Sequence, residues 1–400
     1  MRPMRRGVCP SLAAPTPTGD GLLVRLNPLD RHLSGAALAG LAAAAARFGN
    51  GLVEITARGS LQIRGLTSAT LPRLAAAVHD LGIALATGVA VETGPLAGLD
   101  AAEIDDPRPL AAGLRRALDG TGIGRRLGPK ASVAVDGGGS LHLGGLPADV
   151  RLEALGGGRW GCGATIPLDP VGHVVDWLAA IAADGRRSPR TTAPAAEPIG
   201  RHRLHGDRLA VGVGLPFGQV PAAALAGLTG SEAREFRLSP GRAILAVGLC
   251  SNAAADWAGR AKAAGFITDP RDPRRSIAAC PGCPACATGE LPARAMAEDI
   301  AARNPALLDG SLTLHVSGCA KGCAHPRPAM LSLVGVDKAC TIALDGSPMG
   351  RLAPSAAIGV LTRLADLVAQ ERATGETAAN CLTRLGQGPI ARLLRDEVHA

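Results

Sequence analysis

The sequence contains no tyrosine, and it has only four phenylalanines and three tryptophans among 400 residues. Because 47% of the residues are apolar, the chain can bury a large core, and this core must consist mainly of aliphatic side chains. Stacking on aromatic rings, on which many single-stranded nucleic-acid binders depend, is therefore not expected to be the basis of ligand binding. The length predicts two or more domains.

Long hydrophobic runs are also absent. No stretch of about 18 uncharged apolar residues occurs, so an ordinary transmembrane helix is not expected. The arginines of the N-terminal "MRPMRRGVCPSL" precede no apolar segment, so neither a secretory nor a twin-arginine signal is expected. We therefore expect a cytoplasmic protein without a membrane partner, in which the ten cysteines are thiols or metal ligands rather than disulfides.

Acidic residues are fewer than basic ones, 34 against 42, which gives a formal net charge of +8. The excess comes mainly from arginines spread along the chain, and no nucleic-acid-binding motif accompanies it, so a nucleic-acid partner is not expected. Arginine binds carboxylates and phosphates with a planar fork of donors. A polyanionic small ligand and a simple compositional bias are both compatible with this charge.

The chain repeats itself on either side of a Pro- and Thr-rich segment, 188–200, which we interpret as a linker. Each side has a short apolar strand pattern, an "AALAGL" helix at 36–41 or 223–228, and a second strand pattern ending in Gly-Leu. Further on, a predicted strand, turn and long helix from Gly163 parallel those from Cys340. Chance similarity between alanine-rich segments is the alternative. The repeats predict an α+β protein of two similar halves: ferredoxin-like modules at 15–75 and 201–255, and larger α/β modules at 85–187 and 260–400.

Five of the ten cysteines lie close together in the second half, in "CPGCPACATGE" and "HVSGCAKGCAHP": Cys280, Cys283, Cys286, Cys319 and Cys323. Thiolates grouped as an early set and a late pair can enclose one metal centre. Zinc favours C-x2-C pairs, whereas the late pair here is C-x3-C in a glycine-rich loop, which suits a [4Fe-4S] cluster better. Zinc and purely structural thiols remain the alternatives.

The spacing Cys280-x5-Cys286 followed by Cys319-x3-Cys323 resembles the cluster signature of the nitrite and sulfite reductase haemoprotein superfamily. This resemblance implies a duplicated reductase-like fold, with those four cysteines as cluster ligands and Cys283 as a spare thiol. In the reductases, the last of the four also bridges to the iron of sirohaem.

Polar residues alternate along the predicted strand "EITARGSLQIRGL", where Thr56, Arg58, Ser60, Gln62 and Arg64 share one face. Two arginines and a glutamine can bind a ligand with several carboxylates, although a solvated strand face would give the same pattern. The corresponding strand of the superfamily carries a Thr-x-Arg motif that binds tetrapyrrole carboxylates or the substrate anion.

Lys130, in "RRLGPKASVAVDGGGS", resembles the first lysine of the Lys-x-Lys pair with which sulfite-reducing members hold their oxyanion. Ser132 occupies the second position, which argues against reduction of sulfite or nitrite.

Together with "RRGVCPSLAAPTPTGDGLLVRL" and "PLAGLD" (95–100), "HVSGCAKGCAHP" resembles the precorrin-3B synthase family over nearly the whole chain. This resemblance implies an O2-dependent monooxygenase of aerobic cobalamin biosynthesis. It inserts oxygen at C20 of precorrin-3A and forms a lactone, using a [4Fe-4S] cluster, a mononuclear non-haem iron and an electron donor such as an NADH-linked reductase or ferredoxin. The substrate would take the place of sirohaem between the halves. Arg58 and Lys130 would be catalytic, and Arg58, Gln62, Arg64 and Lys130 would bind its acetates and propionates.

The ligands of the mononuclear iron are not identified by the resemblance. His202, His205 and Asp207 in "RHRLHGD" have a plausible spacing, and His325 is either a ligand or a hydrogen-bond donor to the cluster. Lys321, between the two late cysteines, has no assigned role. The alternatives are a sirohaem-dependent nitrite or sulfite reductase and, in a different class, an iron–sulfur or zinc protein with a structural or regulatory role.

Overall fold

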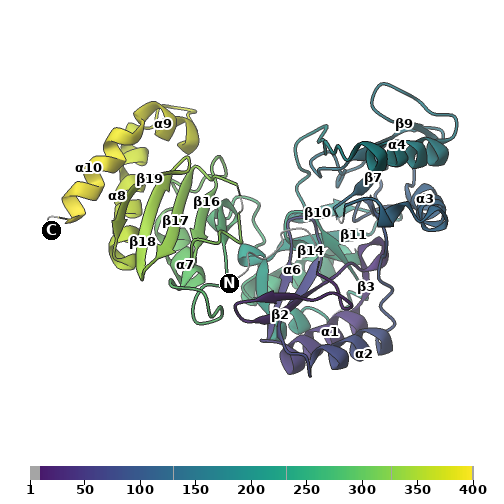
Figure 1. Ribbon diagram of the computed structural model, residues 1–400, viewed down its shortest axis with the longest axis horizontal. Helices are drawn as coiled ribbons and strands as arrows, with labels where there is room; N and C mark the ends of the chain where they lie inside the picture. The colour runs from purple at the N-terminus through teal and green to yellow at the C-terminus, as the bar shows by residue number, and fades with distance from the viewer. Residues whose placement is uncertain (1–9, 129, 231, 326, 399–400) are drawn as a thin grey trace. The chain divides into compact units, whose positions relative to one another are not determined.

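The computed structural model describes residues 10–398 except 129, 231 and 326. Contacts divide the chain into two compact units, one formed by 1–17 with 21–268 and the other by 18–20 with 269–400 (Figure 1). The division therefore falls after residue 268, so the first unit contains the expected linker 188–200 and both expected ferredoxin-like modules. The described residues form four sheets, three in the first unit and one in the second.

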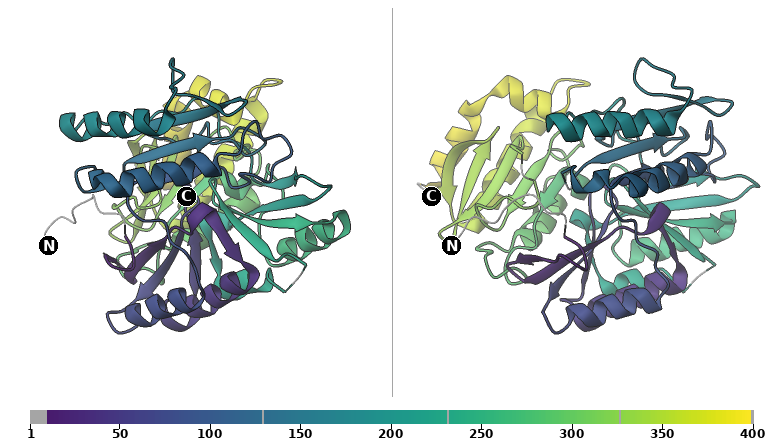
Figure 2. Two further views of the ribbon diagram at one scale, coloured as in Figure 1. Left: turned by 90° about the vertical axis from the view of Figure 1, so that its right-hand side faces the viewer. Right: turned by 45° about the vertical axis from the view of Figure 1, so that its right-hand side comes forward.

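The first sheet has the strand order β1-β2-β5-β4-β12. Helices α1 and α2 lie side by side against it (Figure 2). Helix α1 begins where the Ser34 side chain accepts a hydrogen bond from the Ala37 amide, and it buries an alanine- and leucine-rich face. The elements are β1 (Thr16–Thr18), β2 (Gly21–Leu26), β4 (Leu52–Ile55), β5 (Leu61–Leu66), β12 (Gln219–Pro221), α1 (Gly35–Phe48) and α2 (Leu71–Asp80).

The second sheet, in the order β10-β11-β14-β13-β3, repeats this arrangement. The two sheets exchange one strand each: β3 pairs with β13 of the second sheet, and β12 pairs with β4 of the first. One apolar core runs through both modules. The elements are β3 (His32–Ser34), β10 (Gly200–Arg203), β11 (Leu209–Gly214), β13 (Glu235–Ser239), β14 (Ala243–Leu249), α5 (Ala222–Gly227) and α6 (Ser251–Ala263).

The repeat extends to unusual backbone angles at the two exchanged strands. Short 3-10 turns, Leu29–Arg31 and Pro216–Gly218, precede β3 and β12. At equivalent positions of these turns φ is 50° for Asp30 and 53° for Phe217, then 60° for Arg31 and 80° for Gly218. Left-handed angles at non-glycine residues are uncommon, so their recurrence supports the duplication that the sequence predicts.

The third sheet, β6-β7-β8-β9, is parallel except for β9, with α3 and α4 packed against each other. The hairpin of this sheet ends with strand Arg159–Gly161. The prediction of a strand from Gly163 is wrong, because the chain there turns towards α4, whose first amides are capped by Asp169. The elements are β6 (Ala90–Thr93), β7 (Ser132–Asp136), β8 (Val150–Gly156), β9 (Arg159–Gly161), α3 (Arg108–Thr121), α4 (Pro170–Asp184) and the 3-10 turn Ile123–Arg125.

The second unit repeats this plan with one more strand, in the order β15-β16-β17-β18-β19 (Figure 1). Strands β15, β16 and β17 are parallel, and β18 and β19 are antiparallel additions. The elements are β15 (Ile277–Ala279), β16 (Leu314–Ser317), β17 (Leu331–Val336), β18 (Ala339–Leu344), β19 (Ser347–Leu352), α7 (Ala293–Arg303), α8 (Pro354–Glu371), α9 (Ala378–Leu385), α10 (Gln387–Val398) and the 3-10 turn Pro273–Ser276.

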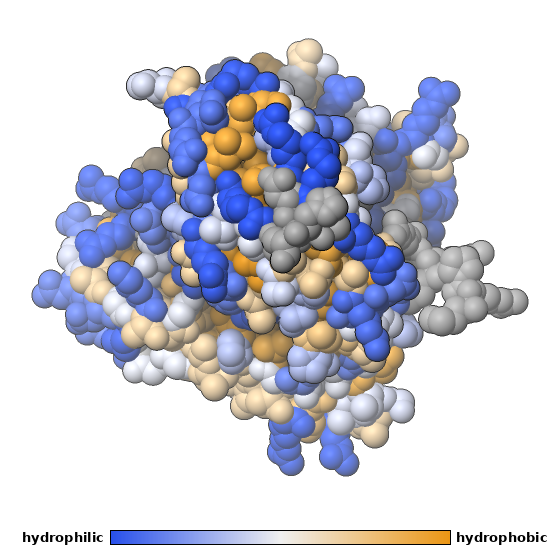
Figure 3. All heavy atoms as spheres, turned by 90° about the vertical axis from the view of Figure 1, so that its left-hand side faces the viewer, coloured by the Kyte–Doolittle hydropathy of each residue, from blue (hydrophilic) through white to orange (hydrophobic). Residues whose placement is uncertain are grey.

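Within the described part of the chain, no helix has the length and apolar character needed to cross a membrane. The face drawn in Figure 3 shows hydrophilic side chains around smaller hydrophobic areas.

Candidate functional site

The predicted cluster ligands lie where two neighbouring strands end. Cys280 follows β15 directly, and Cys319 comes two residues after the end of β16. Because β15 and β16 are parallel, their carboxyl ends meet at one edge of the sheet. There the Gly318 amide donates a hydrogen bond to the Cys280 sulfur over 3.1 Å, an interaction that stabilises a thiolate.

Three of the four predicted ligands are within electrostatic reach of one another. Burial raises the pKa of the Cys280 thiol, and the neighbouring thiols of Cys319 and Cys286 raise it further, while the amides of Gly318 and Gly282 act in the opposite direction. Thiolates crowded in this way repel each other unless a cation compensates their charge. A bound iron–sulfur cluster would supply that compensation.

Glycines allow the two cysteine segments to approach each other closely. A Cβ atom on Gly318 would lie 3.0 Å from the Cα of Gly282, and one on Gly289 would lie 2.6 Å from the Cys283 nitrogen. Backbone thus packs against backbone, and the amides of Gly318 and Gly282 lie within hydrogen-bonding reach of the Cys280 thiol. Such amides are the usual hydrogen-bond donors to cluster sulfurs, so the donor set and its surroundings fit a cluster.

The N-terminal segment 18–20 also contributes to this region. The Gly19 carbonyl accepts a hydrogen bond from the Ala287 amide over 2.9 Å, and a Cβ atom on Gly19 would lie 2.4 Å from the Cys286 sulfur. The Cys286 sulfur is also 3.3 Å from the Thr288 hydroxyl. Gly19 thus leaves the space that the Cys286 side chain occupies, a role that the sequence did not reveal.

Cys323 is exposed and Cys283 is half-buried. Across the described ranges, no three or more His, Cys, Asp or Glu side chains are already grouped to hold a metal ion. The four-cysteine site therefore stays a prediction, which the convergence of Cys280, Cys286 and Cys319 supports.

Two histidines adjoin the late cysteine loop. His315 lies within β16 and is only 5% exposed, and its ring centroid is 5.9 Å from that of His325. Burial, with a smaller contribution from His325, lowers the pKa of His315 to about 4. Sequence reasoning missed His315, although a histidine in the middle of a short buried strand was a usable signal.

The single strand expected over 54–66 is wrong: β4 ends at Ile55, and Thr56, Arg58 and Ser60 lie in the turn of a hairpin. Only Gln62 and Arg64 lie on the polar face of β5, while Leu61 and Ile63 on its other face are fully buried. Both polar side chains have protein partners. With its amide in the orientation that satisfies its neighbours, Gln62 donates to Glu54 and accepts from Arg25, each over 2.8 Å.

Glu54 on β4 is the centre of this network. Its carboxylate is 3.5 Å from the Arg64 guanidinium and accepts a hydrogen bond from Gln219 of the exchanged strand β12. A buried carboxylate therefore neutralises part of the expected anion site. The role of Glu54 was not predicted, because Gln219 approaches it from a strand 165 positions away in the chain.

Arg58 and Lys130 lie near the amino ends of β7 and β8. Arg58 donates to the Pro147 carbonyl over 2.9 Å, and burial lowers the pKa of its guanidinium. Lys130 is exposed, and its carbonyl accepts a hydrogen bond from Arg187, which also pairs with Asp149 over 2.6 Å. Asp149 is close enough to raise the pKa of Arg58, so these cations share one region of the unit.

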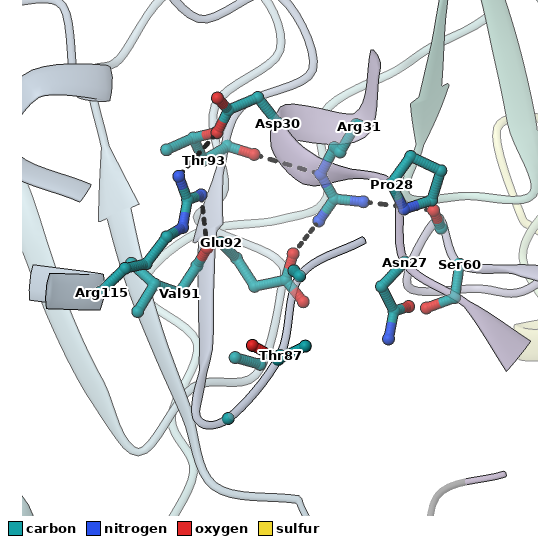
Figure 4. Close-up of a pocket in the computed structure, with 14 residues that line it drawn as sticks. Asn27, Pro28, Asp30, Arg31, Ser60, Thr87, Val91, Glu92, Thr93 and Arg115 are labelled. Carbon is teal, nitrogen blue, oxygen red and sulfur yellow. Dashed lines mark hydrogen bonds and ion pairs between the residues drawn. The ribbon is translucent and has the colours of Figure 1, made fainter. Parts of the chain in front are cut away.

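A pocket of about 80 Å³ lies beside this region, lined by segments 27–31, 59–60 and 86–93 and by Arg115. Figure 4 shows the Arg31 guanidinium between the Glu92 carboxylate, 2.6 Å away, and the Thr93 carbonyl, 3.2 Å away. Arg115 extends to Asp30 over 2.9 Å. Because these charges are paired within the pocket, it does not attract an anion strongly.

The possible iron-binding triad in 202–207 does not form. His202 is buried, and its Nε2 lies 3.1 Å from the Pro198 carbonyl oxygen, whereas His205 and Asp207 lie exposed in the following turn. The alternation of strand β10 places His202 inward, so sequence spacing alone was misleading here.

Comparison with known proteins agrees with this geometry. Residues 14–81 match the nitrite/sulfite reductase ferredoxin-like half domain. A protein of Sinorhizobium sp. described as precorrin-3B synthase is 42% identical to this chain, over 97% of this chain and 94% of the relative. The chain belongs to the precorrin-3B synthase family.

The fold is also that of a known structure outside the precorrin-3B synthase family. The NirA protein of Mycobacterium tuberculosis superposes with a TM-score of 0.64 at 18% identity, covering 92% of this chain and 84% of NirA. At this identity the likeness concerns the fold, and it confirms the expected duplicated reductase-like architecture.

Proposed function

We propose that the chain catalyses the precorrin-3B synthase reaction, the conversion of precorrin-3A to precorrin-3B in cobalamin biosynthesis. The single observation that carries this proposal is the 42% identity over nearly the full length of both chains. In the proposed reaction one atom of O2 enters at C20 of the tetrapyrrole, an acetate of ring A closes a lactone, and the second oxygen atom leaves as water after the uptake of two electrons and two protons.

The cofactor residues of the proposal are Cys280, Cys286, Cys319 and Cys323, which would hold a [4Fe-4S] cluster. The cluster would supply single electrons, received from an NADH-linked reductase or a ferredoxin. The amide of Gly318 already donates to Cys280, and this hydrogen bond would stabilise the ligating thiolate. A mononuclear non-haem iron is the second cofactor of the proposal.

The substrate residues of the proposal are Arg58, Gln62, Arg64 and Lys130. Precorrin-3A carries several acetate and propionate groups, and charge-assisted hydrogen bonds would hold them. Arg58 and Lys130 would act nearest the reacting part of the substrate. Glu54 holds Arg64 and Gln62 in place, so these two would fix the orientation of the carboxylates rather than add net positive charge.

We also propose that the enzyme works in the cytoplasm. The described cysteines form no disulfide with one another, and a reducing compartment keeps cluster-binding thiols available.

The decisive experiment is an anaerobic incubation of the holoenzyme with precorrin-3A and a reductant, followed by addition of ¹⁸O2. Mass spectrometry should show one labelled oxygen in the tetrapyrrole.

An Arg58→Ala variant should bind precorrin-3A more weakly, by roughly tenfold or more for the loss of one charge-assisted contact. A product without label, or purified protein with the Soret band of sirohaem, would instead favour a nitrite or sulfite reductase.

A further inference from the structure

His315 occupies a position in the sheet where an apolar side chain would be expected. In the parallel sheet it pairs in register with Ala278 of β15 and Ser332 of β17. Its strand neighbours Leu314 and Val316 point to the opposite face and are fully buried. The residues beside His315 on this face of the sheet, Ala278 and Ser332, are thus small, and the imidazole is the one large side chain among the three.

The buried edge of this imidazole has no protein partner. The Nε2 atom is inaccessible to solvent and makes no hydrogen bond within the described residues. An unsatisfied buried polar group of this kind is unfavourable unless a partner completes it. The neighbouring Cε1 atom lies 3.6 Å from the position of a Cβ on Gly322, so this edge of the ring faces the loop between Cys319 and Cys323.

A second imidazole, that of His325, lies close to the first. The rings of His315 and His325 are 5.9 Å apart, centroid to centroid, with an interplanar angle of 56°. Two imidazoles that bind one ion with metal–nitrogen distances of about 2.1 Å have centroids roughly 4.5–5.5 Å apart. The rings therefore need to approach each other by roughly half an ångström, a shift within the reach of a side chain on a loop.

We propose that His315 and His325 are two ligands of one divalent transition-metal ion beside the cysteine loops. Neutral imidazole suits iron, zinc, copper and nickel. Two protein ligands leave the remaining coordination positions to exchangeable molecules. This inference rests on the proposed function, under which the ion is the mononuclear non-haem iron, and it gives that iron a place next to the cluster.

The test compares metal and sulfide in purified holoenzyme, a readout that does not require precorrin turnover. The unaltered protein should contain five irons and four acid-labile sulfides per chain, one iron more than a [4Fe-4S] cluster holds. His315→Ala and His325→Ala should each lose one iron and keep four sulfides. Nitric oxide, which gives mononuclear Fe(II) a characteristic spin-3/2 paramagnetic resonance signal, should report the iron in the unaltered protein and not in either variant.

His173→Ala is a matched control. The Nε2 of His173 is likewise buried without a partner, and its ring lies 5.9 Å from that of Trp177, but it is in the other unit. This variant should keep all five irons. Should His315→Ala fail to fold, His325→Ala decides, because its side chain lies on a loop outside the sheet.

The proposal is overturned if both histidine variants keep the fifth iron and its nitric oxide signal, or if the unaltered protein holds only four irons. It is equally overturned if the iron content stays at five and only the reduction potential of the cluster changes, since His315 would then be a hydrogen-bond donor to the cluster. Oxygenation of precorrin-3A in any of these cases would leave the proposed function standing.

Discussion

At the scale of single residues, Gly19 offers a sharp test of the cluster site. Its backbone is compatible with alanine, but the added Cβ atom would lie 2.4 Å from the Cys286 sulfur. Gly19→Ala should therefore displace Cys286 and reduce the iron and sulfide content of the purified protein severalfold. Iron and sulfide assays measure this directly.

Gly120 provides the control for that substitution. It lies within α3, and nothing is within 4 Å of an added Cβ atom. Gly120→Ala should leave the iron content unchanged and stabilise the protein by up to about 1 kcal/mol, because alanine is the better helix former. If Gly19→Ala retained full sulfide, Cys286 would not be a ligand.

Residue patterns in the sequence predicted which way a side chain points better than they predicted which partner it contacts. The alternation at 61–64 correctly predicted that Leu61 and Ile63 face the apolar core and that Gln62 lies on the other face, although it missed the turn at 56–60. It could not predict that Glu54 and Gln219 would meet the polar row, because strand pairing brings them there. The cysteine spacing likewise indicated a common site, whereas the approach of Gly19 depends on the path of the N-terminal segment.

At the scale of elements, Arg31 joins three segments. It pairs with Glu92 over 2.6 Å, donates to the Arg58 carbonyl over 2.8 Å and is 6% exposed. Arg31→Ala would leave these partly buried acceptors without a donor, so urea unfolding should show a loss of about 3 kcal/mol. The double variant with Glu92→Ala should lose less than the sum of the two single losses.

The comparison for Arg31 is Arg271, whose ion pair with Asp269 is exposed on both sides, at 90% and 57%. Arg271→Ala should change the free energy of unfolding by less than about 0.5 kcal/mol. Equal effects of the two arginine substitutions would show that Arg31 does not hold the segments together.

Some helices and loops could be predicted from the sequence, whereas the exchanged strands could not. The repeated "AALAGL" predicted α1 and α5, and glycine with proline predicted the cysteine loops. The exchange of β3 and β12 was not predictable, since three-residue strands carry no periodicity of their own. Their partner residues also lie far away in the chain, with Glu235 opposite Ser34 and Gln219 opposite Glu54.

At the scale of the whole molecule, Glu103 makes stability depend on pH. Burial raises its pKa from 4.5 to about 7, with further contributions from Asp106 and Asp100. The folded protein thus binds this proton more tightly than the unfolded chain does, so the contribution to stability is present below pH 4.5 and is lost as the pH rises towards 7. Unfolding midpoints measured from pH 4.5 to 8 should show this fall, and Glu103→Gln should remove it. An unchanged pH profile in that variant would mean that Glu103 titrates normally.

The exchanged strands also explain how the two ferredoxin-like modules of one chain can come to carry different residues at equivalent positions. Two copies of a module that exchange a strand usually form a domain-swapped homodimer, whereas here both copies belong to one polypeptide. In the first copy, the Arg31 side chain lies against Gly59, and at the equivalent place in the second copy, the Arg242 side chain lies against Gly218. Arginine and glycine have thus changed places between the copies, while all four residues keep left-handed angles. A true homodimer could not evolve such a pair, because each substitution would appear on both sides at once. Fusion of the two copies has therefore freed each side of the symmetry axis to acquire its own charge.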